Sequence, residues 1–302
     1  MTARPPSPQA VSWNELQIPI PRSWDAIVRD DRHLIFEHEL RPVLEVRWEL
    51  PGNNRYDHKQ GEKIIARMQK EADRTLIPAD TPPPLSGLTG SYHIQCFKRH
   101  SSSTTECALL TCKGCTTPIL LRFYADFFLQ AAKNQNVISS LSCCRPEASN
   151  GWWSIQDIRF RLPGGFSLDS YSFRFGLSRL SFASKTSNLT LCRLAPASQH
   201  LKNNSFQQLF ASFSHSALGE QEIIDDATLQ YVRLPGLAGR LFSRLRRRKS
   251  FLFARFSHHF QQDRITGFLL ESSRPIRPDT LQTIQDSYGI IQQETAGACI
   301  HP

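Results

Sequence analysis

The chain has 302 residues, of which 40% are hydrophobic and 21% are charged, and its formal net charge is +9. This length suits two domains of about 140–150 residues each, and the composition excludes a chain that is disordered throughout. Uninterrupted apolar stretches are only a few residues long, which excludes a membrane-spanning helix. The N-terminal segment lacks the apolar core of a secretory signal, so we expect a soluble cytoplasmic protein.

The two halves of the chain open with a similar pattern. Residues 16–48 align with residues 158–194 at a shift of 142, which becomes 146 after a four-residue insertion. A repeat period near half the chain length indicates internal duplication. The later paired positions are Phe36 with Phe182, Val43 with Leu189, Arg47 with Arg193 and, at a shift of 147, Leu120 with Gly267.

This repeat predicts three parts of the chain. They are a disordered tail over residues 1–11, a first domain over 12–145 and a second domain over 152–296. The short polar segment 145–151 is expected to form the turn between the two domains.

In the first half, the alternation of Leu16, Ile18 and Ile20 predicts a short strand that Pro21 ends. A hairpin, a helix, a loop, three strands and a closing helix are expected to follow. The hairpin is predicted over 33–37 and 43–48, the helix over 57–74 and the loop over 78–91. The three strands are predicted over 92–97, 107–111 and 118–124, and the closing helix over 125–141.

The second half is expected to repeat this order. Asp279 follows Pro278 and is predicted to cap the last helix. The ranges are a strand over 157–162, a hairpin over 178–182 and 189–194, a helix near 206–213, strands over 227–233, 251–257 and 264–271, and a helix over 279–287.

This element order predicts an α+β fold in two tandem copies, each a mostly antiparallel sheet covered by helices. Each half begins with an apolar strand that ends in a proline, followed by an aromatic residue and then a hairpin. These residues are Pro21 and Trp24 in the first half, and Pro163 and Phe166 in the second. This arrangement is the basis of a resemblance to the PsbP-like superfamily, which includes photosystem accessory proteins, a Ran-binding transport factor and small bacterial chaperones. The resemblance implies domains that bind other proteins and do not catalyse.

Cys112 and Cys115 form a C-x-x-C motif in a turn between two predicted strands. Two thiolates at this spacing are half of a tetrahedral zinc site, whereas a redox motif would begin a helix. The alternative is a reduced turn without metal, so zinc is a conditional prediction. The candidates for the remaining ligands are Cys107, His100, Cys143 and Cys144.

The most basic stretch is Arg240–Lys249, with six positive charges and no negative one. Apolar residues alternate with these charges, a pattern typical of a surface that binds nucleic acid, an acidic protein or an anionic membrane. The alternative is a solvated insertion between two strands. The residues assigned to an anionic partner are Arg244, Arg246, Arg247, Arg248 and Lys249.

Four glutamates lie along the first predicted hairpin, near His33 and His38. Strand alternation places them on the solvated face, whereas carboxylates that act as acid and base need burial to separate their pKa values. These residues are Glu37, Glu39, Glu45 and Glu49.

Three functional hypotheses follow. Motifs of hydrolases, nucleotide-binding loops and metalloproteases are absent from the sequence, which favours a non-enzymatic protein-interaction module, either an adaptor or a chaperone. The second hypothesis is a nucleic-acid-binding protein that uses the run 240–249. The third is an enzyme whose site is assembled from dispersed residues.

Overall fold

The structure is a computed structural model of the chain. It describes residues 9–49, 76–102, 104–125, 127–128, 131, 138, 141–143, 151–216, 220, 222–236 and 249–291. The chain divides into two compact units, residues 1–156 and 157–302. Within the described residues, strands account for 52% and helices for 15%.

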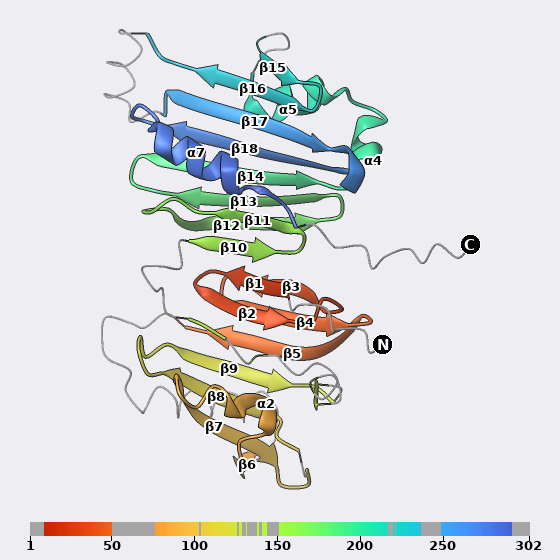
Figure 1. The fold of residues 1–302 in the computed structure, drawn as a ribbon, viewed down its shortest axis with the longest axis vertical. Helices are drawn as coiled ribbons and strands as arrows, with labels where there is room; N and C mark the ends of the chain where they lie inside the picture. Colours follow the sequence, from red (N-terminus) through yellow and green to blue (C-terminus); the bar gives the residue numbers. More distant parts are fainter. Residues whose placement is uncertain are drawn as a thin grey trace, which may run out of the picture. The chain divides into compact units, whose positions relative to one another are not determined.

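The predicted α+β fold, with helices covering the sheets, is therefore wrong. The protein is built mainly from antiparallel sheets (Figure 1). The sequence underestimated the strands because several of them have no alternation of buried and exposed residues. The predicted helix 57–74 lies outside the described residues, as does most of the predicted helix 125–141.

The first unit contains a group of three strands and a seven-stranded sheet. The group has the order β10-β1-β2, with β1 (Gln9–Trp13), β2 (Leu16–Ile20) and β10 (Trp152–Ile155). The sheet has the order β3-β4-β5-β9-β8-β7-β6, with β3 (Asp25–Asp30), β4 (His33–His38), β5 (Arg41–Trp48), β6 (Leu76–Ala79), β7 (Tyr92–Arg99), β8 (Cys107–Cys112) and β9 (Pro118–Phe123). A short helix, α2 (Pro83–Ser86), lies between β6 and β7 in the chain.

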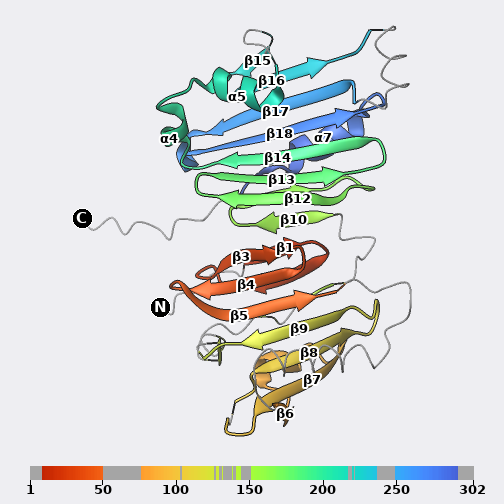
Figure 2. The same ribbon diagram turned by 180° about the vertical axis from the view of Figure 1, so that it is seen from behind.

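The second unit pairs β11 (Ile158–Arg161) with β19 (Gly289–Ile290) and also contains a seven-stranded sheet. The order of this sheet is β12-β13-β14-β18-β17-β16-β15, with β12 (Ser167–Arg174), β13 (Leu177–Ala183), β14 (Ser187–Leu194), β15 (Glu222–Asp225), β16 (Thr228–Arg233), β17 (Phe251–His259) and β18 (Arg264–Ser272). Its described helices are α4 (Ala197–Leu201), α5 (Phe206–Ser214), the 3-10 turn η1 (Phe260–Gln262) and α7 (Pro278–Ser287). Figures 1 and 2 show α7 and α5 on opposite faces of the sheet.

The two seven-stranded sheets share one strand order. Counted along the chain, the seventh strand of each sheet lies at the centre, between the third and the sixth. Phe36 lies opposite Leu44, and Phe182 lies opposite Leu189. Leu44 is therefore the equivalent of Leu189, where the sequence alignment had placed Val43. The alignment is off by one residue because Val43 falls at a register irregularity of β5.

Several strands were missed by the sequence analysis. β1 begins at Gln9, inside the segment predicted as a disordered tail, and β6 begins before the predicted loop 78–91. The division between the units falls after Gln156, whereas the predicted linker covered 145–151; the predicted domain boundaries stay a prediction. The strands for which no range was predicted are β1, β3, β6, β10, β12, β15 and the two-residue β19.

The start of the last helix also differs from the prediction. Arg277 is the N-cap of α7, Pro278 is its first residue, and Asp279 lies in the first turn. Proline suits this position because the first helical N–H groups have no partner within the helix. Asp279 thus contributes a negative charge near the helix N-terminus and not a cap.

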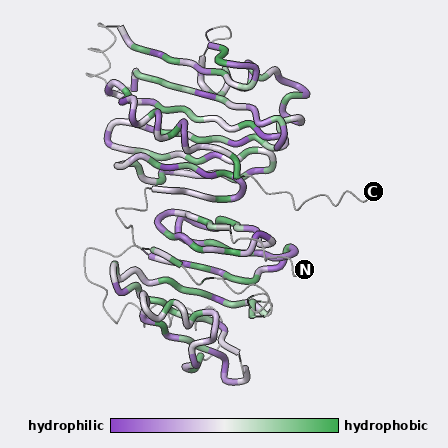
Figure 3. Tube along the Cα trace, viewed as in Figure 1, coloured by the Kyte–Doolittle hydropathy of each residue, from purple (hydrophilic) through white to green (hydrophobic). Residues whose placement is uncertain are grey.

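Buried hydrophobic residues of the strands build the cores of both units, and Figure 3 shows hydrophobic segments along these strands. Leu16, Ile18 and Ile20 of β2 are all buried, as predicted. In the second unit, α5 packs on β16 and β17, with the ring centroids of Phe210 and Phe256 5.2 Å apart. Among the described residues, no helix is long and apolar enough to cross a membrane.

Candidate metal centre and a buried carboxylate

The C-x-x-C motif lies in the turn between β8 and β9, as predicted. Cys112 is the last residue of β8, and two turn residues, Lys113 and Gly114, separate it from Cys115. The Cys112 N–H donates to the Thr117 carbonyl oxygen over 3.1 Å, and the Thr116 N–H donates to the Cys112 carbonyl oxygen over 3.0 Å. Thr116 has a φ of 59°, a left-handed conformation that is strained for a β-branched residue. Backbone strain of this kind is often maintained at binding sites.

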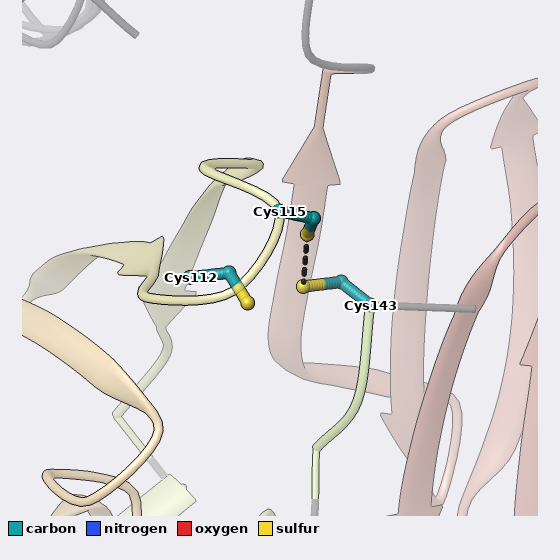
Figure 4. Close-up of side chains that lie close together, drawn as sticks. All are labelled: Cys112, Cys115 and Cys143. Atoms are coloured by element: carbon teal, nitrogen blue, oxygen red, sulfur yellow. Dashed lines mark hydrogen bonds between the residues drawn. The ribbon is translucent and has the colours of Figure 1, made fainter. Parts of the chain in front are cut away.

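A third thiol reaches this turn from a distant part of the chain. The Sγ atoms of Cys112, Cys115 and Cys143 all lie within 4.8 Å of one another (Figure 4). The Sγ atoms of Cys115 and Cys143 are 3.6 Å apart. This separation is far longer than the ~2.05 Å of a disulfide and close to the ~3.8 Å between two sulfurs on a tetrahedral zinc ion. The arrangement can therefore hold a thiophilic metal ion.

Cys143 is held in place by its neighbours. The residue before it, Ser142, exchanges two backbone hydrogen bonds with Gln17 of β2, over 2.7 and 2.8 Å. The Tyr92 hydroxyl donates to the Leu141 carbonyl oxygen over 3.0 Å and lies 3.6 Å from the Cys143 Sγ. Burial raises the pKa of the Cys143 thiol well above its ordinary value, and the other two thiols add to the rise.

The other predicted ligands have different outcomes. Cys107 begins β8, about 17 Å along the strand from Cys112, and burial raises its pKa to about 12. His100 follows the end of β7 that lies beside Cys107, so it also lies away from the cluster. Cys144 is outside the described residues. Of the three candidates that the structure describes, it therefore brings one, Cys143, to the motif.

The equivalent turn of the second unit, between β17 and β18, carries no cysteine. Its Asp263 accepts hydrogen bonds from the Ser198 backbone N–H and hydroxyl, over 2.7 and 2.8 Å. The Asp263 carbonyl oxygen also accepts from the Ala197 N–H over 2.8 Å. Hydrogen bonds thus attach this turn to α4.

Glu45 is buried, which corrects its predicted place on a solvated face. It lies on the inner strand β5, where His33 of β4 and Arg122 of β9 approach it from both sides. Arg47 contacts one of its oxygens at 2.7 Å, and the Tyr124 hydroxyl donates to the other over 3.0 Å.

These donors decide the charge of Glu45. Burial alone would raise the pKa of this carboxyl, but Arg47, Tyr124 and His33 together lower it below its ordinary value. Burial and Arg47 lower the pKa of His33. Glu45 is therefore ionised at neutral pH with both oxygens engaged, which favours a structural role over acid–base chemistry.

The predicted basic surface is almost entirely outside the described residues. Of its five assigned residues, the structure describes Lys249, which is half-buried just before β17. The assignments that lie outside are Arg244, Arg246, Arg247 and Arg248.

No protein-family model matches the chain, and no curated protein matches it. Solved structures similar to it include MucB in complex with MucA, at 10% identity and a TM-score of 0.22, covering 92% of this chain and 82% of that one. A second is the Pseudomonas aeruginosa MucA/MucB complex, at 9% identity and a TM-score of 0.23, covering 92% and 83%. TM-scores of this size do not establish a shared fold, so they support no conclusion about function.

Proposed function

We propose that this chain is a non-enzymatic protein-binding module with a resident zinc ion. The observation that carries the binding role is the edge strand β15. All four of its residues are exposed, with exposed fractions of 64% for Ile223 and 45% for Ile224. Exposed apolar edge strands are normally avoided because they pair with other chains.

The exposed apolar residues are concentrated at this edge. Val232 and Leu234, on β16 and just after it, have exposed fractions of 44% and 70%. Together with Ile223 and Ile224 they make up half of the large hydrophobic side chains exposed among the described residues. We call these four residues the β15 edge surface. Clustered exposure of this kind marks interaction sites, whereas single exposed residues do not.

The charges beside the β15 edge surface indicate the partner. Its exposed neighbours Glu220, Glu222, Asp225 and Asp226 are acidic and outnumber one exposed basic neighbour, Arg233. They complement a basic segment and disfavour nucleic acid. We therefore propose an extended partner segment, rich in apolar and basic residues, that adds to the sheet as a strand beside β15.

The Ile224→Lys variant is expected to bind this partner about tenfold or more weakly, because it places a charge in an apolar contact. A photo-crosslinker at Ile223 would identify the partner segment in cells, and titration with the synthetic segment would give the affinity. Stability should change by no more than about 0.5 kcal/mol, because the site is exposed.

The matched control is Phe175→Lys. Phe175 is 94% exposed, in the turn after β12 at the opposite edge of the same sheet. Unchanged affinity in Ile224→Lys, equal losses in both variants, or crosslinks from Ile223 that disappear with nuclease would contradict the proposal.

Zinc is the proposed cofactor because thiolates prefer it among the available divalent ions. Elemental analysis of the full chain, purified under reducing conditions without added metal, should find about one zinc per chain. The double variant Cys112→Ser, Cys115→Ser should contain none and should unfold at a lower temperature, since metal binding adds to folding free energy. A wild-type protein without zinc would refute this part of the proposal.

A further inference from the structure

We infer that Cys143 is a ligand of this zinc ion, and that the ion attaches the β8–β9 turn to segment 141–143. The inference rests on the proposed zinc site and adds a third ligand and a structural role. The C-x-x-C motif supplies the first two sulfurs from the seven-stranded sheet. Cys143 supplies the third from a segment that pairs with β2, a strand of the separate three-stranded group.

The geometry of the three thiols supports this attachment. Cys143 and Cys112 are buried, with exposed fractions of 6% and 4%, so their sulfurs are sheltered from solvent. Three thiols at zinc-compatible separations, two of them buried and that of Cys115 partly exposed, are fixed by turn and bridge hydrogen bonds and form a preorganised donor set. The Tyr92 hydroxyl contacts the third sulfur from outside the ligand set, as second-sphere groups do at metal centres.

The second unit indicates what the attachment does. There, the equivalent turn is attached to α4 through Asp263. The two units thus restrain the same turn of the same strand order with different chemistry. In the first unit the restraint crosses from the sheet to a segment that pairs with a different group of strands. Its loss would weaken the attachment of segment 141–143 to the sheet and leave the Tyr92–Leu141 hydrogen bond in place.

The test compares the full-length wild type with Cys143→Ser and Cys96→Ser, purified in reductant. Cys96 is a buried thiol of the same unit, on β7, outside the cluster. Zinc affinity is measured by competition with a chromophoric chelator. We expect Cys143→Ser to weaken zinc binding by about 100-fold or more, because loss of a group that only hydrogen-bonds to a ligand already costs about 10–100-fold, and we expect Cys96→Ser to leave it unchanged. Cobalt substitution should give thiolate-to-cobalt absorption that falls in Cys143→Ser.

Hydrogen exchange tests the attachment itself. Removal of zinc from the wild type should speed exchange of the Ser142 and Gln17 amides, which bond to each other's carbonyl oxygens. In Cys143→Ser these amides should already exchange fast, with or without the chelator.

The outcomes separate the two proposals. No zinc in the wild type refutes the zinc site itself. Zinc that is lost from the double variant Cys112→Ser, Cys115→Ser but bound with wild-type affinity by Cys143→Ser refutes the third ligand alone. Exchange of Ser142 and Gln17 that does not respond to zinc refutes the attachment. A Cys115–Cys143 disulfide in place of zinc, seen as a mass lower by two hydrogens, also overturns the inference.

Discussion

Replacing Gly267 with alanine is expected to lower the free energy of unfolding of the second unit by about 3 kcal/mol or more. Gly267 of β18 lies directly opposite Phe256 of β17, and a Cβ atom at Gly267 would lie 2.1 Å from the Phe256 ring. The ring cannot move aside, because its centroid lies 5.2 Å from that of Phe210 and 4.8 Å from that of Phe213 in α5. Urea denaturation, followed through the unfolding transition of the second unit, measures the loss.

A double-mutant cycle isolates this contact. The first unit has Leu109 opposite Leu120 at the equivalent positions, so a leucine in place of the phenylalanine leaves room for a side chain opposite it in this strand order. We therefore expect Gly267→Ala to cost less in a Phe256→Leu background. Gly164→Ala is the control, because a Cβ there meets nothing within 4 Å, and it should change stability by about 0.5 kcal/mol at most. Equal costs of Gly267→Ala in both backgrounds would show that the ring is not the cause.

Replacing Glu45 with glutamine is expected to destabilise the first unit by about 2–3 kcal/mol at pH 7. The change leaves Arg47 and Arg122 without their carboxylate and leaves a buried amide among donors. This loss of stability is smaller than the loss expected when a fully buried ion pair is broken, because both arginines are partly exposed and remain solvated. Glu49→Gln is the matched control, since it makes the same chemical change at an exposed position directly after β5.

The difference between Glu45→Gln and the wild type should depend on pH. The pKa of Glu45 is lower in the folded state than its ordinary value of 4.5, so the unfolded chain takes up the proton first as pH falls. The stability that this carboxylate contributes is therefore fully present above about pH 4.5 and is lost as pH falls through the folded pKa. Urea midpoints at pH 7 and pH 3.5 should show a smaller gap at the lower pH. A gap that is constant or grows with acid would show that Glu45 is not a stabilised carboxylate.

The sequence predicted the inner strands of both sheets more successfully than the edges. The inner strands β8 and β18 carry buried apolar residues in runs that indicate strands. The edge strand β15 has four exposed residues, two of them acidic, and its existence depends on its pairing with β16. An exposed edge strand leaves little signal in its own sequence, because its formation depends on backbone hydrogen bonds to the neighbouring strand.

The candidate sites likewise could be predicted only where the residues are close together in the sequence. The C-x-x-C spacing is local, so Cys112 and Cys115 could be named, and Cys143 was one of four candidates for a further ligand. Its selection depends on the pairing of Ser142 with Gln17, far apart in the chain. Burial of Glu45 could not be read from strand alternation, because the donors that accompany it come from three strands.

The shared strand order has a consequence for how the chain folds during synthesis. In the second unit, β14 becomes an inner strand of the sheet only when β18 pairs with it, about 75 residues later in the chain. Until β18 leaves the ribosome, β14 presents an unpaired apolar edge, and so does β17. The hairpins on either side can form as they emerge, but the central pairing must wait for the last strand. The same delay applies to β5 and β9 in the first unit, so each half passes through an interval in which its most hydrophobic strands are exposed to aggregation or to a chaperone.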